Sequence, residues 1–534
     1  MKGYKVKFTS IRERILENKR EAVLLLAVLL LAAALRLWKI DGYLTFLGDE
    51  GRDVRVVRRF LTDFDLMFVG PRTSIGDMYL GPLYYYLIAP FLALWRFSPV
   101  GPATFVALLS VATVFLTWFA AREWFGKVAA FFASLLFAIS PVVILHARHS
   151  WNPNIMPFFA LLSIFAIWRV WQKREWKWLL VLGVSFAAVL QSHYLGLLLL
   201  PTIGIFWLLT LRNTQYAIRS QALLTRSQAL LIRKKFFIFS LFAFSLFAFS
   251  MSPLVFFDAK HAFRNWGAMV KFFTERQTTV SARPWNAIPD LWPLWQNDVV
   301  TNLLVGREKE WSALVAIVLV IGALWLGRKW HNNQKKVQLA ALRLTSLWIV
   351  VGLLGLGLYK QAIYSHYFEF MFAAPFLLVG AILQELWTDR KWLVIVIGIL
   401  LIWINLQQNP LKDPPQRQLQ RVQEIDRRIM NEAGDKPFNF GLIAKRNYEE
   451  GYLYFFELWK APVREIDAQR SKETITDQLF VVCEDTTSPG NPEPCKPINH
   501  EKAEIANFGW AKIEKEWEQK GVRVFKLVHN PEGQ

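Results

Sequence analysis

Long apolar runs separated by short polar segments dominate the first 410 residues of the chain. Two clear examples are EAVLLLAVLLLAAALRLW at 21–38 and WSALVAIVLVIGALWLG at 311–327. Each is close to the ~20 residues that a helix needs to cross ~30 Å of hydrocarbon. The pattern predicts eleven spanning helices, near residues 21–38, 100–121, 128–145, 154–170, 178–192, 195–211, 236–256, 311–327, 344–359, 370–387 and 391–406.

The polar segments between these helices differ in charge from one side to the other. Segments on the side of the N-terminus contain 26 Lys and Arg, whereas the short segments on the opposite side contain only Arg148 and Lys360. Cytoplasmic loops carry such an excess of positive charge. We therefore expect a multi-pass protein of the plasma membrane with a cytoplasmic N-terminus. The short cytoplasmic loops and the lack of an organelle signal favour a prokaryotic cell.

The apolar runs end near residue 410, and shorter mixed segments follow. They predict a helix at 418–432, a strand at 438–444, an aromatic-rich helix or strand at 448–459, a strand at 478–483, a helix at 510–520 and a strand at 522–528. We therefore expect two domains. Residues 1–410 would form a transmembrane catalytic domain, and residues 411–534 a small α/β domain outside the cell or in the periplasm.

The only two cysteines, Cys483 and Cys495, both lie in this external domain. An oxidising outer compartment would permit a disulfide between them. Two unpaired thiols are the alternative.

Composition agrees with the membrane prediction: 54% of the residues are hydrophobic and only 19% are charged, against ~25% charged in soluble domains. A soluble enzyme, a secreted disulfide scaffold and a disordered chain are excluded. The formal net charge is +20, but residues 1–410 hold 43 basic and 21 acidic residues, while residues 411–534 hold 19 and 21. The positive excess belongs to the membrane loops, so we expect no nucleic-acid partner.

Polar residues gather at the outer ends of the predicted helices. In the first outer loop, Asp49 and Glu50 precede a stretch with the apolar spacing of an amphipathic helix at the membrane interface. A carboxylate held there could act as general base toward an acceptor from outside. Alternatively, the two acids cap that helix and pair with Arg52 or Arg55.

Three further outer segments are rich in cations: HARHSWNPN at 146–154, SPLVFFDAKHAFRNW at 252–266 and LYKQAIYSHYFEFMFAAP at 358–375. Their convergence on one membrane face would suit a lipid-linked phosphate or diphosphate. Taken singly, each is also typical of an interface anchor. No spacing of His and carboxylate residues is diagnostic of a metal, so no cofactor is assigned and a divalent cation stays an option.

Several of these motifs resemble family 39 glycosyltransferases, polytopic enzymes of the GT-C superfamily that include protein O-mannosyltransferases and the lipid A aminoarabinose transferase. The motifs are the Asp49–Glu50 pair, GPLYYYL at 81–87, AREWFGK at 121–127, the ISP…HARHSWNPN segment at 139–154 and HYFEFMFAAP at 366–375. The resemblance covers about residues 20–410. Many relatives have His or Lys where this chain has Gly81, and an acidic residue after the third span, for which Asp258 is the candidate substitute.

The resemblance implies a hexosyl- or pentosyltransferase with a GT-C fold that acts at the outer membrane face. Its donor would be a polyprenyl-phosphate-linked sugar and its acceptor a protein, a lipid or a glycan. Asp49, with Glu50 beside it, would deprotonate or orient the acceptor hydroxyl, and the attack would invert the anomeric carbon.

Two groups of residues complete the predicted site. The first would bind the donor phosphate and consists of cations: Lys260, His261, Arg264, Lys360 and, more weakly, Arg148. The second would contact the sugar or the acceptor: Asp258, His366, Tyr367 and Tyr84.

Three other functions remain open from the sequence. One is an oligosaccharide or polymer ligase, which would require a diphosphate-linked glycan. Another is a lipid or glycan transporter, whose activity would survive Asp49→Asn. The third is a non-catalytic membrane scaffold, which would tolerate loss of both Asp49 and Glu50.

Overall fold

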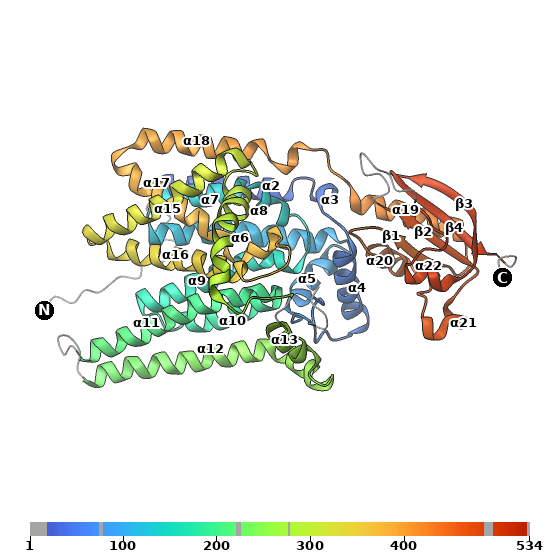
Figure 1. The fold of residues 1–534 in the computed structure, drawn as a ribbon, viewed down its shortest axis with the longest axis horizontal. Helices are drawn as coiled ribbons and strands as arrows, with labels where there is room; N and C mark the ends of the chain where they lie inside the picture. Colours follow the sequence, from blue (N-terminus) through green and yellow to red (C-terminus); the bar gives the residue numbers. More distant parts are fainter. Residues whose placement is uncertain (1–18, 74–77, 220–225, 276–277, 485–494, 531–534) are drawn as a thin grey trace. The chain divides into compact units, whose positions relative to one another are not determined.

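The computed structural model describes residues 19–73, 78–219, 226–275, 278–484 and 495–530, and these form two compact units (Figure 1). We call the first the helical unit; it comprises Met1–Trp38, Leu66–Leu87 and Ala103–Pro414. We call the second the mixed unit; it comprises Lys39–Asp65, Ile88–Pro102 and Pro415–Gln534.

This division differs from the predicted one, which put all of residues 1–410 into one domain. The boundary between Pro414 and Pro415 lies close to the predicted one at residue 410. Two segments of the first outer loop, however, join the C-terminal residues. The reason is local packing, because the helix that carries Asp49 lies directly on a helix of the C-terminal segment.

The helical unit confirms the prediction of a mainly α, polytopic membrane protein. Its helices are α2 (Lys19–Leu37), α7 (Lys127–Ile139), α8 (Pro141–His146), η1 (Asn152–Ile155), α9 (Met156–Lys173), α10 (Trp178–Ser192), η2 (Tyr194–Leu198), α11 (Leu199–Arg219), α12 (Arg226–Lys260), α13 (Arg264–Thr274), η3 (Pro284–Ala287), α14 (Ile288–Pro293), η4 (Leu294–Leu304), α15 (Lys309–Asn332), α16 (Lys336–Gly357), η5 (Ser365–Met371), α17 (Ala373–Asp389), α18 (Lys391–Gln407) and η6 (Pro410–Lys412). Two more, α5 (Leu83–Leu94) and α6 (Val100–Trp124), run from one unit into the other.

Six helices of the described chain are long and apolar enough to cross a membrane, or seven if the bent pair η5–α17 counts as one. The predicted eleven are therefore not reproduced as uninterrupted helices. Four further apolar helices, α5, α7, α10 and α18, have between 10 and 17 residues.

Interruptions within the predicted helices account for part of the difference. The predicted span at 128–145 is split at Ser140, after which Pro141 begins α8. Proline suits the first position of a helix because its missing N–H would have no partner there. The Ser140 hydroxyl donates a 2.8 Å hydrogen bond to the carbonyl of Leu303. The predicted span at 370–387 begins earlier, as η5, and bends by 57° before α17.

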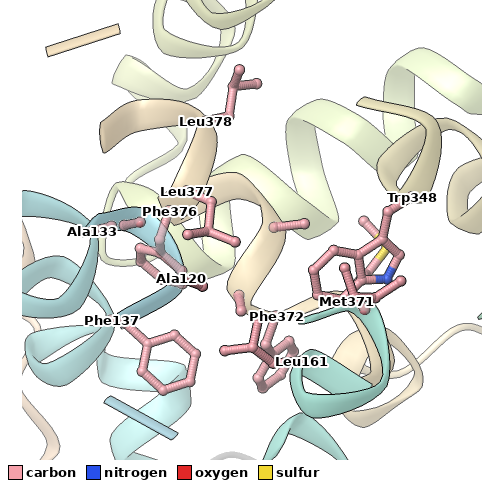
Figure 2. Packing of buried hydrophobic residues seen from close by; sticks show 14 of the residues in the cluster. Ala120, Ala133, Phe137, Leu161, Trp348, Met371, Phe372, Phe376, Leu377 and Leu378 are labelled. Carbon is pink, nitrogen blue, oxygen red and sulfur yellow. The ribbon is translucent and has the colours of Figure 1, made fainter. Parts of the chain in front are cut away.

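Close helix packing forms the core of the helical unit. Helix α17 lies on α7, and α10 lies between α9 and α12. Figure 2 shows Phe137 of α7 against Phe376 of α17, with ring centres 5.3 Å apart. A Cβ atom added at Gly380 would lie 2.8 Å from the carbonyl oxygen of Ala129, so this glycine permits the approach of the two helices. Small residues at such crossings are typical of membrane helices.

The mixed unit contains a four-stranded sheet and several helices, and confirms the predicted small α/β domain. Its helices are α3 (Ile40–Tyr43), α4 (Gly48–Asp63), α19 (Gln418–Ala433), α20 (Glu450–Leu458), η7 (Ala468–Arg470), α21 (Ser471–Thr474) and α22 (Ala503–Phe508). Its strands are β1 (Asn439–Ile443), β2 (Gln478–Cys483), β3 (Ala511–Gln519) and β4 (Val522–His529), in the order β1-β2-β4-β3. Strands β1 and β2 are parallel, and the other two pairs are antiparallel.

The predicted helix at 510–520 is wrong, because these residues form β3. The charge-rich AKIEKEWEQ segment has little apolar content, and most of it is exposed on one edge of the sheet. Its conformation is set by the turn that follows it. Lys520 and Gly521 both have positive φ, at 53° and 75°, as in a two-residue hairpin of type I′. Residues 511–519 therefore form strand β3, which pairs with β4, rather than a helix.

Candidate functional site

The predicted acidic pair lies at the N-terminus of α4, in the mixed unit. The apolar face of this helix matches the predicted amphipathic pattern, since Val54 and Val57 are buried. Asp49 and Glu50 stand in the first turn, where the helix dipole stabilises negative charge.

Asp49 is held by two donors. Its Oδ1 accepts a 2.8 Å hydrogen bond from Nη1 of Arg52, one turn further along α4, and a 2.7 Å hydrogen bond from the hydroxyl of Tyr448. Arg52 also binds Asp53 at 2.8 Å. The side chain of Asp49 is 40% exposed. Its carboxylate is therefore held in one orientation and remains accessible to solvent. Such a group can accept a proton from an incoming hydroxyl.

Tyr448 is a hydrogen-bond donor in this network. Burial raises the pKa of its hydroxyl, and the neighbouring Asp49 raises it further, although Arg52 acts in the opposite direction. The phenol therefore stays protonated at neutral pH and donates to Asp49.

Glu50 has a different task. Its Oε2 accepts the backbone N–H of Leu47 at 3.1 Å and its Oε1 accepts the hydroxyl of Thr45 at 2.7 Å. The side chain is buried, and burial raises its pKa. Glu50 thus caps the start of α4 and Asp49 pairs with Arg52, as the structural alternative predicted, and the side chain of Asp49 stays partly exposed.

Two glycines let α4 lie directly on the C-terminal segment. A Cβ atom at Gly51 would stand 2.3 Å from the backbone nitrogen of Gly451, and one at Gly48 would stand 2.4 Å from the ring of Tyr448. The backbone N–H of Gly48 donates to Oδ1 of Asn447 at 2.8 Å. The main chain around Asp49 is therefore positioned by residues 447–451.

Arg55 fixes the next turn of α4. Its guanidinium contacts Glu450 at 2.9 Å, Glu457 at 2.6 Å and Glu465. Burial alone would lower the pKa of Arg55, but these three glutamates raise it. The predicted pairing of Arg55 with the acidic pair is not formed; its partners lie in the C-terminal segment.

The predicted cation Arg148 is buried within the helical unit. Its guanidinium donates to the carbonyl oxygens of Leu35 at 2.7 Å and Trp38 at 2.6 Å. These bonds satisfy the end of α2, which leaves four carbonyls without helical partners. The same segment carries His149, whose pKa burial lowers to about 4, so its ring is neutral at pH 7.

The other cations of the prediction are exposed. Lys260, His261 and Arg264 lie at the junction of α12 and α13, and Lys360 lies after α16. The His261 ring stacks on Phe257 with ring centres 4.0 Å apart. The backbone N–H of Lys360 donates to the carbonyl of Thr279 at 2.9 Å.

Asp258 is buried at the same junction and caps α13. Its two carboxylate oxygens accept the backbone N–H groups of Asn265 at 2.7 Å and Trp266 at 2.9 Å. The Asn265 side chain in turn accepts the N–H of Tyr79 at 2.7 Å. Asp258 therefore shapes the turn that presents the exposed cations.

Tyr84 and His366 lie in two different surroundings within the helical unit. Tyr84 is fully buried, with its hydroxyl 2.5 Å from that of Ser150. His366 lies in an aromatic cluster, with its ring centre 4.6 Å from those of Trp151 and Tyr367. His193 joins this cluster at 6.0 Å, and the sequence interpretation had not singled it out.

Tyr448 and Asn447 are the main residues that sequence reasoning missed. Each contacts the start of α4 although 399 positions separate the partners. No local pattern marks them, since asparagine and tyrosine before a helix are ordinary.

The predicted cysteine pair forms a disulfide, with Cα atoms 6.3 Å apart. Within the described part of the chain, no three His, Cys, Asp or Glu side chains are arranged to hold a metal ion.

The helical unit also contains an apolar groove of about 430 Å³. Its lining comes from α14, η4, α15, α16 and α17, and includes Trp292, Trp295, Leu319, Ile349 and Leu378. An elongated apolar chain is the kind of ligand that fits such a surface.

Comparisons with known proteins agree with this architecture. Residues 80–252 match the family model described as dolichyl-phosphate-mannose-protein mannosyltransferase. A segment of 112 residues is 30% identical to YkcB of Bacillus subtilis, which is named as a mannosyltransferase. That match spans 20% of this chain and only 15% of the relative.

Two solved structures share the fold over much longer stretches. ArnT from Cupriavidus metallidurans, bound to undecaprenyl phosphate, has a TM-score of 0.52 at 12% identity, over 95% of this chain and 97% of ArnT. The oligosaccharyltransferase of Archaeoglobus fulgidus in complex with Zn and sulfate has a TM-score of 0.50 at 12% identity, over 86% of this chain and 68% of the enzyme. The family model therefore matches the part of the chain from residue 80 to residue 252, and the chain as a whole shares the fold of these two membrane enzymes.

Proposed function

We propose that the protein transfers a sugar from a polyprenyl-phosphate donor to an acceptor at the external face of the membrane. The observation that carries this proposal is the Asp49 carboxylate, which is partly exposed and held at 2.8 Å by Arg52 and 2.7 Å by Tyr448. A base with a fixed orientation lowers the entropy cost of reaching the attacking geometry.

In the proposed reaction, the acceptor hydroxyl oxygen attacks the anomeric carbon while the bond from that carbon to the phosphate oxygen breaks. The hydroxyl proton passes to Asp49, and the bonding electrons leave with the polyprenyl phosphate. Because attack comes from the side opposite the leaving group, the anomeric carbon is inverted.

The donor class has two kinds of support. The matching family is described by dolichyl-phosphate-mannose, and the ArnT structure holds undecaprenyl phosphate. The apolar groove of the helical unit offers a surface for a polyprenyl tail.

The exposed cations Lys260, Arg264 and Lys360 are our candidates to stabilise the leaving phosphate, with His261 beside them. Arg148 is a weaker candidate, since its guanidinium binds two carbonyl oxygens. A divalent cation at the phosphate is an addition to this scheme that chelation of the purified protein would test.

Glycosyl transfer by the purified full chain, with a panel of polyprenyl-phosphate sugars, tests the proposal. The variants are Asp49→Asn and the matched control Asp63→Asn, which changes an exposed aspartate at the other end of the same helix. We expect wild type and Asp63→Asn to transfer one sugar, and Asp49→Asn to be slower by about 10²–10⁴-fold, the usual contribution of a general base.

Other outcomes would contradict the proposal in different ways. Equal transfer by Asp49→Asn would remove Asp49 from the mechanism. Transfer from diphosphate-linked glycans alone would indicate a ligase. Movement of a lipid-linked sugar across vesicles, unaffected by Asp49→Asn and without any product, would indicate a transporter.

A further inference from the structure

A polar cavity of about 630 Å³ lies within the mixed unit, and the proposed transfer reaction does not use it. It is lined by α3 and α19, by the residues just before each of them, and by the turn after β3: Lys39, Asp41, Gly42, Pro415, Gln416, Arg417, Gln420, Arg421, Glu424 and Lys520. A cavity of this size suits a small molecule or a lipid headgroup.

Cations outnumber anions in this cavity. Lys39, Arg417, Arg421 and Lys520 face two carboxylates, those of Asp41 and Glu424. The Lys520 ammonium lies 3.2 Å from Glu424, and Arg421 lies 3.5 Å from Glu484. Arg417 has no ion-pair partner among the residues that the structure describes.

Backbone conformation supplies an independent observation. Lys39, Arg417 and Lys520 have φ values of 47°, 51° and 53°. This left-handed region favours glycine and asparagine, because a Cβ atom crowds the backbone there. Three of the four cations of one cavity thus occupy positions where glycine would fold more easily. Backbone strain of this kind gathers at ligand sites.

The cavity also faces the beginning of α19. Arg417 is the N-cap of this 16-residue helix, and Arg421 lies one turn later on the same face. The first backbone N–H groups of a helix lack helical acceptors and attract anions. Gly42 lies close by, since a Cβ atom there would stand 3.1 Å from Pro415 and 3.9 Å from Arg417.

The sequence indicates where such an anion would come from. Lys39 follows the apolar helix α2 with one intervening residue, Trp38, and the other cavity segment begins at Pro415, with seven residues between it and the end of α18. Cations that directly follow a membrane helix meet the phosphates of lipid headgroups. Two arginines with planar guanidinium groups suit phosphate oxygens in particular.

We propose that this cavity binds a phosphate-bearing anion, either a lipid headgroup or a free phosphate ester, apart from the site at Asp49. The ligand phosphate contacts Arg417, Arg421 and Lys520, and the cavity anchors the mixed unit to anionic membrane surfaces when the phosphate belongs to a lipid. This inference stands without the glycosyl transfer proposal.

The test uses glycine substitutions that the backbone favours. In the double variant Arg417→Gly, Lys520→Gly, two cations are lost from positions where glycine relieves strain, so we expect the melting temperature without ligand to be unchanged or higher. The matched control is Lys460→Gly. Lys460 is an exposed lysine of the same unit with a φ of 57°, and it does not line the cavity.

Two probes distinguish the sources of the phosphate. The first is inorganic phosphate titrated onto the purified full chain in a neutral detergent, with the rise in melting temperature as the readout. The second is reconstitution into phosphatidylcholine vesicles with and without phosphatidylglycerol, with the same readout. For wild type and Lys460→Gly we expect stabilisation by at least one probe, and for the double variant at least about tenfold weaker apparent affinity, since each cation lost removes a charge-assisted contact.

Each result is decisive. Stabilisation by phosphatidylglycerol alone supports the proposal and assigns a lipid headgroup, whereas a response to inorganic phosphate supports it and assigns a free phosphate site. Equal stabilisation of wild type and the double variant would overturn it, as would a wild type that responds to neither probe.

Discussion

At the scale of single residues, the surroundings of Asp49 explain why one carboxylate of an adjacent pair is available for chemistry. Glu50 is buried and accepts two hydrogen bonds within its own loop, whereas Asp49 is partly exposed and accepts hydrogen bonds from Arg52 and Tyr448. The local sequence allowed two roles for the acidic pair, helix capping and general base; Glu50 caps α4, and the base role of Asp49 stays a prediction. The local sequence could not assign one role to each residue, because Tyr448, which contacts Asp49, is 399 positions away.

Tyr448→Phe tests the contact across that separation. The change removes a hydroxyl that donates to Asp49 at 2.7 Å. A hydrogen bond to a charged group is worth about 1.5–3 kcal/mol, so we expect transfer to slow by at least about tenfold with little change in melting temperature.

Tyr454→Phe is the matched control, since the Tyr454 hydroxyl donates to the carbonyl of Phe97 rather than to a carboxylate. Its transfer rate should stay close to that of wild type. Equal slowing in both variants would mean that Tyr448 acts through general packing.

Arg148 shows what the local sequence cannot distinguish about a cation. Its motif of two histidines and an arginine suggested anion binding, but the guanidinium binds two main-chain carbonyls at the end of α2. A cation can bind either an anionic ligand or the free carbonyl oxygens at a helix C-terminus, and sequence spacing does not distinguish the two.

Arg55 leads to a prediction about pH. Burial raises the pKa of Glu457, but the contacts with Arg55 and Arg59 outweigh it and the net shift is downward. A lowered pKa stabilises the folded state above the unfolded value of ~4.3, and this contribution is lost as the pH falls through the folded pKa. We expect the melting temperature to fall below about pH 4.

In Arg55→Gln, three glutamates lose their shared cation. We expect a loss of about 2 kcal/mol at pH 7, below the range for fully buried pairs because the glutamates are partly exposed, and a weaker dependence of the melting temperature on acid. Thermal unfolding of both proteins between neutral pH and pH 3 measures this. An unchanged acid profile would show that other carboxylates dominate.

At the scale of elements, the packing of α4 on α20 depends on paired glycines. The backbone nitrogen of Gly451 leaves no room for a side chain at Gly51. Gly51→Ala must separate the two helices, and we expect a loss of roughly 1–3 kcal/mol, as for other overpacked contacts, together with reduced transfer because Asp49 moves.

Gly204→Ala is the control for that change. Gly204 lies inside α11 with no atom within 4 Å of an added Cβ, so alanine should raise stability by about 0.5–1 kcal/mol through helix propensity. Melting temperatures and transfer rates of both variants provide the comparison. A stable and active Gly51→Ala would contradict the described packing.

The elements that could be predicted from sequence are those whose periodicity is unambiguous. Helix α19 and strand β2 lie where the apolar pattern predicted them. Strand β3 could not be recognised because lysine and glutamate are good helix formers, and its conformation depends on pairing with β4. The aromatic-rich segment of α20 is compatible with a helix or a strand by its pattern alone. In the structure it is a helix that packs on α4.

At the scale of the whole molecule, the charge asymmetry of the loops predicts which side of the membrane each segment occupies. The Cys483–Cys495 disulfide agrees with an oxidising compartment for the mixed unit. The sequence contains no other cysteine, so labelling can report orientation directly.

We expect a membrane-impermeant maleimide to label intact cells only after treatment with an impermeant reductant. The partly exposed thiol of Cys495 should then react from outside, because we expect the mixed unit to face the exterior. The control is Cys483→Ser, Cys495→Ser, which should not be labelled before or after lysis. Labelling that requires lysis would reverse the proposed orientation.

The assignment of Lys39–Asp65 and Ile88–Pro102 to the mixed unit has a practical consequence for exchanging parts between homologous proteins. A recombination point at residue 410 alone would pair α4 of one protein with α20 of another. Gly51 would then pack against a backbone to which it is not matched. Chimeras that exchange all three segments together preserve this contact. Acceptor preference, if it resides in the mixed unit, can therefore be transplanted only as a discontinuous cassette.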